Sequence, residues 1–483
     1  MLILALILIP IFGALIVFAL GGQNQLRSKQ LALAVALLEL VVFGFIFKEF
    51  NTSGNLLFQK EWLPDFGISF KFSIDGISVL LLGLSTLLVP LIVLSTFKVV
   101  YEKSNLLYAL ILLTEAALVG VFMAGDLFLF YFFFEIALIP VYFLGLIWGQ
   151  ANAAKATFKM LAYTIFGSLL MLVGLVYLYS KGQTADMEAL KASMAFIPAG
   201  VQSTLFCLFM LAFAIKMPIF PLHTWQADAY SESSTPATML LAGLLSKMGV
   251  YGLIRIALPM SPLGAKEMGY MVMVLGVVGL IYGSIIAVKQ DNLKRLIAYS
   301  SFAHMGLMAA AIFSGTLEGT QGAVFQMLAH GLNAVGLFFV VKIISERTGS
   351  RSLSSLGGLS QDAPWLSVTF MIILLGSVAL PLTNGFVGEF LMLKGVFDHG
   401  KLLGIISGIS IILGAVYLLR LFQKTMFGEK QNTDVVIKDI SGSETIVLFV
   451  ISALVILMGV FPNCILKISE PASQQILDYM AQF

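Results

Sequence analysis

The chain is dominated by apolar runs of roughly twenty residues, and this feature limits its fold more than any other. An α-helix needs about twenty apolar residues to cross the hydrocarbon core of a bilayer. Hydrophobic residues make up 59% of the chain and charged residues only 11%, with a mean hydropathy of +0.98. Soluble domains usually carry about a quarter charged residues. The sequence therefore predicts a polytopic integral membrane protein.

About fourteen such runs are separated by polar or helix-breaking connections. Because lipid cannot satisfy open sheet edges, we expect an all-α integral membrane protein with about fourteen transmembrane helices. These predicted helices 1 to 14 are residues 2–20, 31–49, 76–98, 105–124, 126–148, 160–180, 201–221, 236–258, 268–288, 296–314, 322–341, 366–393, 402–422 and 445–462. The first run lacks a positive segment before it and a small-residue cleavage site after it, so we expect a membrane helix and not a signal peptide.

Lysine and arginine are distributed unequally between the two sides of this predicted bundle. The odd-numbered connections hold 16 of them and the even-numbered connections with the tail hold 10, while Lys216 and Lys247 lie inside helices. Positive residues are enriched in cytoplasmic connections. The sequence thus predicts a multi-pass membrane protein with both termini on the outer face.

Several classes of function are poorly supported by the sequence. It contains no GxGxxG after a strand, no P-loop, no CxxC pair and no HExxH, which argues against nucleotide, iron–sulfur and zinc sites in this chain. A net charge of +2 does not suggest nucleic acid as a partner. Cys207 and Cys464 are too few for a disulfide scaffold, and we expect buried, inert thiols.

Ionisable residues inside the apolar runs are the strongest functional signal. A charge at the bilayer centre costs about 2.5–3.5 kcal/mol, so it needs a partner, water or a function. The candidates are Glu39, Glu115, Glu135, Lys216, Lys247 and Glu389. A structural ion pair between Glu135 and Lys216 is one interpretation, but buried pairs often add little net stability, which favours a proton or ion route. For Glu39 the structural interpretation is favoured.

Lysine suits a proton route, because a desolvated ammonium can release its proton whereas a guanidinium stays charged. His304 and His330 also fall near mid-span. Three interpretations of these histidines remain open: hydrogen-bonded residues of the bundle, two axial ligands of a haem, and members of a titratable relay.

Helix breakers give an independent signal. Pro218 and Pro221 interrupt helix 7, and Pro381 and Gly385 interrupt helix 12. Broken helices at corresponding places in two halves indicate inverted repeats with a site near the membrane midplane. We predict repeats of five helices, 4–8 and 9–13, which make Lys216 and Glu389 equivalent. The predicted divisions are residues 1–104, 105–258, 268–424 and 425–483, the last holding helix 14 and a tail.

Four motifs carry a family resemblance. They are KMPIFPLHTWQADAYSESSTPATMLLAGLLSKMGVYGLIR at 216–255, FFFEIALIPVYFLGLIWG, AYSSFAHMGLMAAAIFSG and GAVFQMLAHGLNAVGLFF. Over helices 3 to 13 the chain resembles the antiporter-like membrane subunits of respiratory complex I, most closely their M-type branch, and it is related to the D-type component of Mrp antiporters. Glu389 stands where sister types L and N usually carry lysine, and the long lateral helix of type L is absent. The sequence departs from the family at residues 226–230, where Gln-Ala-Asp-Ala-Tyr replaces the usual Leu-Pro-Asp-Ala-His.

The resemblance implies a non-redox subunit of a proton-translocating NADH:quinone oxidoreductase in an energy-transducing membrane, the bacterial inner membrane. It implies a relay through Glu135, Lys216, Lys247, His304, His330 and Glu389, with Glu115 as a secondary position. Glu135 and Lys216 are then the helix 5–helix 7 pair, and Lys247 is the central lysine. No cofactor is expected in this chain; quinone, FMN and iron–sulfur clusters are expected in partner subunits, with sister subunits L and N on either side. A subunit of an Mrp-type sodium/proton antiporter or of a membrane-bound hydrogenase, and a passive structural anchor, remain alternatives.

Overall fold

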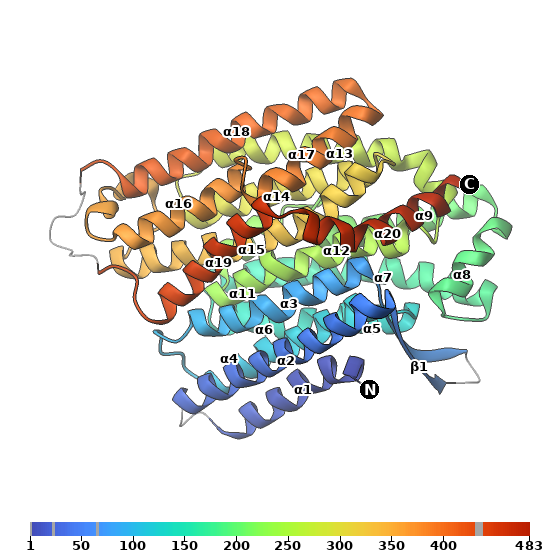
Figure 1. Ribbon diagram of the computed structural model, residues 1–483, viewed down its shortest axis with the longest axis horizontal. Coiled ribbons are helices and arrows are strands. Elements are labelled where there is room, and N and C mark those ends of the chain that lie inside the picture. Colours follow the sequence, from blue (N-terminus) through green and yellow to red (C-terminus); the bar gives the residue numbers. More distant parts are fainter. Residues whose placement is uncertain (1, 22–24, 64–66, 430–437) are drawn as a thin grey trace.

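The computed structural model describes residues 2–21, 25–63, 67–429 and 438–483. Long helices run side by side in an elongated bundle (Figure 1). Helix α1 (Leu2–Ala19) begins, and helix α20 (Asn463–Ala481) ends, toward the right of this view, on the side where helix α8 (Met187–Ser193) also lies. We call this end of the bundle the outer end. The opposite end, where α3 (Gly76–Ser95) ends and α4 (Ser104–Met123) begins, is the inner end.

The other helices follow in chain order. The first half also contains α2 (Gln25–Ser53), α5 (Leu127–Ile136), α6 (Leu138–Ile147), α7 (Ala153–Gly182), α9 (Ala199–Lys216), α10 (Gln226–Glu232), α11 (Thr235–Leu240) and α12 (Ser246–Gly252). The second half contains α13 (Pro262–Lys289), α14 (Leu293–Ile312), α15 (Leu317–Thr348), α16 (Pro364–Val378), α17 (Asn384–His399), α18 (Lys401–Met426) and α19 (Ser443–Val460). Two π-helical turns, η3 (Leu241–Leu245) and η4 (Leu253–Ala257), flank α12.

The prediction of a predominantly helical membrane protein is confirmed. Each of the predicted runs is largely helical, and the described residues contain 12 spans that are long and apolar enough to cross a membrane. Two predicted spans are not among these 12. Helix α14 has 20 residues but includes the polar Arg295 and His304, which lower its hydropathy. The run predicted at 366–393 is divided into α16 and α17, each shorter than a full span.

One short segment outside the spans departs from the predicted all-α architecture. Strands β1 (Leu56–Leu63) and β2 (Ile68–Ile74) form an antiparallel hairpin, with Leu56 opposite Ile74 and Lys60 opposite Phe70. The rule that excludes open sheets holds only in lipid, because water satisfies the free edges elsewhere. The alternating sequence ISFKFSI of β2 has the period of two that is typical of a strand.

The C-terminal segment expected to be a tail forms the amphipathic helix α20. Its buried residues pack against α3 and α15, and the Tyr479 hydroxyl donates to the Lys191 carbonyl at 2.9 Å. A strongly one-sided helix is typical of an element that lies on a surface with its apolar face covered. Its overall hydropathy is low, so the lengths of the apolar runs did not predict this helix.

The prediction of buried cysteines is also wrong. Cys207 and Cys464 are free thiols on the surface of the chain. The outer face of a membrane bundle is itself apolar, so a thiol within an apolar run need not face the interior.

The two expected helix breaks lie where the prolines are. Helix α9 ends at Lys216, directly before the turns that contain Pro218 and Pro221. Residues 379–383, which include Pro381, separate α16 from α17. Proline lacks an amide hydrogen and cannot continue the helical hydrogen-bond ladder. Lys216 precedes its break, whereas Glu389 follows its break by about one helical turn.

Gly385, in the first turn of α17, has no room for a side chain. A Cβ atom at this position would overlap the carbonyl oxygen of Gly376 in α16. We expect Gly385→Ala to lower the free energy of unfolding by about 1–3 kcal/mol, as overpacking does elsewhere. Thermal unfolding of the purified protein measures this loss. Gly408→Ala in α18, where a Cβ would meet nothing within 4 Å, is the matched control and is expected to be neutral or slightly stabilising.

Two spans are completely enclosed by the others. In both Thr235–Ala257 and α15, the whole apolar window is buried inside the bundle. Lys247 lies on the first of these spans and His330 on the second. The fold therefore places two of the predicted functional residues on its most deeply enclosed helices.

Candidate functional site

Four of the predicted residues form a line through the centre of the bundle. The Lys247 ammonium lies 2.8 Å from Nδ1 of His330. The rings of His330 and His304 contact each other with their centres 5.5 Å apart. Nδ1 of His304 lies 3.0 Å from a carboxylate oxygen of Glu389. We call these four residues the polar line; it crosses from α12 through α15 and α14 to α17.

Lys247 sits at one end of the polar line, directly after the π-helical turn η3. Its side chain is 0% exposed, and its ammonium also donates to the Ala242 carbonyl at 2.5 Å and lies 3.3 Å from the Ser246 hydroxyl. These contacts use all three donors of an ammonium group. Within the described chain, no carboxylate forms a salt bridge with Lys247. Its proton is therefore held by hydrogen bonds and not fixed by a counter-ion.

Glu389 sits at the other end, between α14 and α18. A small cavity of about 10 Å³ lies beside it, lined also by Ser284, Ser410 and Tyr417. This space is about the size that holds one water molecule. Hydroxyl groups and a carboxylate around such a space are suitable partners for a bound water.

Glu135 and Lys216 are electrostatic neighbours, as the sequence led us to expect. Lys216 is buried, and its ammonium lies over the ring of Phe134, 4.7 Å from the ring centre. In the part of the chain that the structure describes, no direct salt bridge joins the two. The strength of the attraction between Glu135 and Lys216 therefore depends on the distance between their charged groups, which a small side-chain movement would change.

Glu39 and Glu115 form a buried acidic pair. The sequence predicts Glu115 as a secondary position of the relay and favours a structural interpretation of Glu39. Both carboxyl groups are fully buried where α2 packs against α4, and each acts electrostatically on the other. None of their carboxylate oxygens has a geometrically regular hydrogen bond within the described residues. Two adjacent buried carboxylates repel when both are ionised, which favours a shared proton. Depth in an apolar run is the sequence signal for Glu39, and depth does not reveal a partner that lies 76 positions away.

The haem interpretation of His304 and His330 does not fit the geometry. Their rings touch edge to face, which leaves no space for a porphyrin between them. Nδ1 of each ring is already engaged, with Lys247 in one case and Glu389 in the other. Over the described ranges, no group of three or more His, Cys, Asp or Glu residues is arranged to hold a metal ion.

Further polar contacts hold the elements around the polar line in place. The side-chain amides of Asn333 and Asn384 exchange hydrogen bonds of 3.2 Å, which tie the start of α17 to α15. Asp228 accepts hydrogen bonds of 3.0 Å from both Lys159 and Arg295, which tie α10 to α7 and α14. Burial alone would raise the pKa of Asp228, but these hydrogen bonds hold it below its ordinary value. The sequence contained no signal for either pairing.

Comparison with known proteins gives a consistent result. The profile of the family described as NADH:quinone oxidoreductase/Mrp antiporter, TM, matches residues 124–415. The chain is 35% identical to NADH-quinone oxidoreductase subunit M of Rickettsia prowazekii (strain Madrid E), over 98% of this chain and 97% of that protein. It is 34% identical to F(420)H(2) dehydrogenase subunit M of Methanosarcina mazei, over 99% of this chain and 98% of that protein.

A solved structure agrees with the sequence relatives. A chain of respiratory complex I from Thermus thermophilus superposes with a TM-score of 0.90 at 32% sequence identity, covering 99% of this chain and 100% of that one. The matched region includes every residue of the polar line. This chain therefore belongs to the family of transmembrane subunits shared by NADH:quinone oxidoreductases and Mrp antiporters.

Proposed function

We propose that this chain is a proton-translocating membrane subunit, of the M type, in an NADH:quinone oxidoreductase. The observation that carries the proposal is the polar line from Lys247 through His330 and His304 to Glu389. A row of ionisable groups across a bundle interior is costly unless it serves a proton or ion pathway. Each group in the row can both bind and release a proton, so the row suits proton transfer.

Transfer along the polar line follows from its contacts. The Lys247 ammonium donates toward His330, and a proton received at one ring nitrogen allows release from the other. Because the two imidazole rings touch, His330 can pass a proton on to His304 directly or through one water. Glu389 then accepts it from His304 and exchanges it with water. The proton count is unchanged at every internal step.

Lys216 and Glu135 are proposed to control this transfer electrostatically. When Lys216 lies closer to Glu135, the carboxylate offsets more of the electrostatic potential of its ammonium. When Lys216 lies farther from Glu135, its positive charge acts more strongly on the other buried ionisable groups. A positive charge brought closer to Lys247 favours loss of the Lys247 proton. Coupling to electron transfer requires that the redox state of a site in another subunit changes the free energy of this pair's interaction, and the reverse.

The membrane arrangement is part of the same proposal. Twelve spans together with α14 and the broken pair α16–α17 give fourteen crossings. Two inverted five-helix repeats are supported by breaks in the corresponding helices α9 and α16–α17. Both termini are proposed to face the outside of a bacterial inner membrane, which makes the inner end cytoplasmic.

The partners and cofactors follow from the assembly. We propose sister subunits of types L and N on either side of this chain, and FMN, iron–sulfur clusters and quinone in other subunits. An Mrp-type antiporter remains a second candidate because the matching profile covers both assemblies. The similarity to an F(420)H(2) dehydrogenase subunit also leaves the electron donor to be tested.

Isolation of the intact assembly tests this proposal. We expect a tagged chain to purify with redox subunits that contain FMN and iron–sulfur clusters, and the reconstituted complex to acidify the vesicle lumen on addition of NADH and quinone. Acidification in sodium-free buffer at an undiminished rate identifies protons as the transported ion. Purification with membrane subunits alone, and no NADH oxidation, would instead establish the antiporter.

A further inference from the structure

A polar cavity of about 640 Å³ lies at the inner end of the bundle, away from the residues of the polar line. We call it the inner cavity. It is bordered by the starts of α11 and α14 and by the end of α15, and its lining includes Ser233, Thr235, Lys342, Glu346 and Arg351. A single water molecule needs about 10–15 Å³, so the inner cavity has room for a larger polar group.

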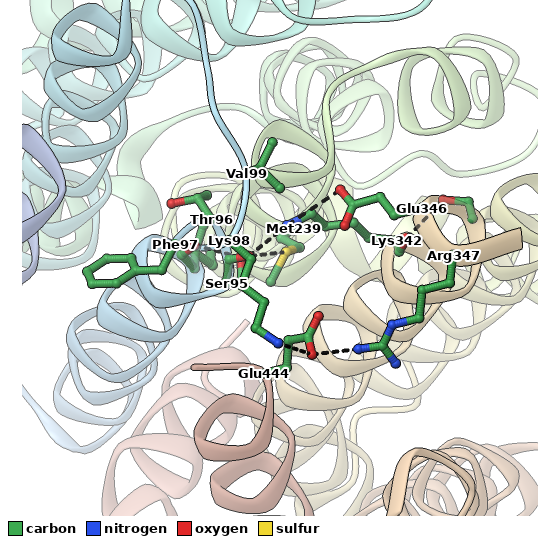
Figure 2. Close-up of polar contacts among 12 residues, drawn as sticks. Ser95, Thr96, Phe97, Lys98, Val99, Met239, Lys342, Glu346, Arg347 and Glu444 are labelled. Carbon is green, nitrogen blue, oxygen red and sulfur yellow. Dashed lines mark hydrogen bonds and ion pairs between the residues drawn. The ribbon is translucent and has the colours of Figure 1, made fainter. Parts of the chain in front are cut away.

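Three cations on this side of the bundle lie against carboxylates, as Figure 2 shows. Glu444 joins Lys98 at 2.8 Å and Arg347 at 2.7 Å. Lys342 lies 3.8 Å from Glu346. These contacts link the segment after α3 to α15 and α19, so they fix the end of α15 that lines the inner cavity.

Arg351, on the lining of the inner cavity, is not compensated in this way. Its carbonyl accepts the Leu293 amide at 2.8 Å, which fixes its backbone beside the start of α14. Its side chain is partly buried and, within the described residues, forms no ion pair; Glu232 attracts it without touching it. Arginine does not release its proton under working conditions. The inner cavity therefore carries a permanent positive charge on its lining.

A second cation lies directly behind the same wall. Lys294, in the first turn of α14, is 1% exposed and donates to the Ser233 carbonyl at 2.8 Å. Arg351 repels it and Glu232 attracts it, but in the part of the chain that the structure describes no carboxylate contacts its ammonium. Two like charges held close together destabilise each other unless an opposite charge lies nearby. An anion in the inner cavity would touch Arg351 and lie one residue, Ser233, away from Lys294.

Hydrogen-bond donors without partners lie on the same wall. The Ser233 hydroxyl is buried and has no partner among the described residues. Helix α11 begins at Thr235 with no capping side chain and no acidic residue in its first turn. It continues through η3 and α12, so this turn is the positive end of the 23-residue span Thr235–Ala257. Donors at such a helix start, beside a guanidinium, favour an anion.

We propose that the inner cavity binds a phosphate group, held by the Arg351 guanidinium, the hydroxyls of Ser233 and Thr235, and the backbone amides at the start of α11. A guanidinium bonds two oxygens of a phosphate at once. The remaining phosphate oxygens are acceptors for the hydroxyl and amide donors, which approach from a different element. This site goes beyond the function proposed for the polar line, and it needs no proton transfer.

The phosphate group has two possible sources with the same chemistry, free phosphate and a phospholipid head group. Tyr101 and Trp148 also line the inner cavity, and these aromatic residues are enriched at the level of the head groups. Basic pockets between membrane helices bind anionic head groups on the cytoplasmic side, where the inner end is proposed to lie.

Binding of radiolabelled inorganic phosphate to the intact complex, purified in detergent and washed free of exchangeable lipid, tests the site. We expect Arg351→Gln to weaken binding of one phosphate per complex by about tenfold or more, because glutamine cannot form the charged two-point contact. Arg27→Gln is the matched control, since Arg27 is exposed at the inner end and does not line the cavity. It should bind phosphate as the wild type does.

A second pair of variants tests the opposite wall without changing Arg351. Thr235→Asp places a carboxylate in the first turn of α11, where negative charge stabilises the helix but repels phosphate. Thr235→Asn has nearly the same shape and no charge. We expect the affinity for phosphate to fall by about tenfold or more in Thr235→Asp and to change by no more than about twofold in Thr235→Asn.

Mass spectrometry of complexes purified without the lipid wash identifies the source. If the group belongs to a lipid, the wild type should retain one phosphatidylglycerol more than Arg351→Gln does. Equal lipid content, with weaker phosphate binding by the variant, identifies free phosphate. Wild-type phosphate affinity in Arg351→Gln or in Thr235→Asp would overturn the site, as would equal losses in Thr235→Asp and Thr235→Asn. Acidification is not measured, so failure of the site and failure of the polar line are distinguishable.

Discussion

A complex that carries Lys247→Ala is expected to assemble but to lose NADH-driven proton pumping by about two orders of magnitude, the size of a typical acid–base contribution. Lys247 forms one end of the polar line, where its ammonium contacts His330. Alanine removes the group that gives the proton to His330. Acidification of the lumen of reconstituted vesicles, followed with a pH-sensitive dye, measures the loss.

Two controls show that the loss is specific. Oxidation of NADH by soluble artificial acceptors should be unchanged, because it uses partner subunits and not this chain. Lys29→Ala, which removes another buried lysine that donates to backbone carbonyls, should pump normally. An assembled Lys247→Ala complex that pumps at the wild-type rate would show that Lys247 does not carry protons.

Glu389→Gln is expected to have a similarly large effect, lowering the pumping rate by about tenfold or more. Glutamine has nearly the same shape as glutamate, and it can still accept a hydrogen bond from His304, so the packing of α14 against α17 is preserved. It cannot bind and release a proton in the working range. The change therefore removes the exchange step and leaves the structure in place.

The matched control for this substitution is Glu318→Gln. Glu318 forms an exposed ion pair with Lys394 at the outer end of α15, and exposed pairs contribute little. Its replacement should leave both pumping and assembly unchanged. If Glu389→Gln pumps as fast as Glu318→Gln, the polar line does not end in a titratable carboxylate.

The sequence predicted the fold correctly in the long apolar segments, because lipid requires their backbone polar groups to be satisfied within helices. Apolar runs of twenty residues must be helical in lipid, and each predicted run is helical apart from the breaks at the prolines. The hairpin at 56–74 and helix α20 were missed because they are not long apolar runs. In such segments the spacing of the apolar residues, and not the mean hydropathy, indicates the secondary structure. Their signals were present in the alternation of β2 and in the one-sided pattern of α20.

The site was predicted only in part, for a physical reason. Depth along a helix identifies which ionisable residues are enclosed, and this placed Lys247 and Glu389 among the candidates. Depth does not specify which helices are neighbours. The contact between His304 and His330, the adjacency of Glu39 and Glu115, and the burial of Lys294 all depend on packing between distant segments.

Lys294 illustrates this limit most clearly. It lies two residues before the predicted start of helix 10, so it was counted with the charged residues of a connection. In the folded chain the segment after α9 covers it, and its ammonium is enclosed by Ser233 and Thr238. Sequence position near a helix end does not distinguish a solvated lysine from one buried under a loop.

The central claim, that protons move along the contiguous polar line, is tested most directly at its middle. His330→Leu removes the group that joins Lys247 to His304, while both ends of the polar line remain. His399→Leu makes the same change at the outer end, where His399 contacts the Ser314 carbonyl and the Tyr270 ring, away from the polar line. NADH-driven acidification by the two reconstituted complexes is compared at equal content of assembled complex. We predict a loss of about tenfold or more for His330→Leu and none for His399→Leu; equal rates in the two would contradict transfer along the polar line.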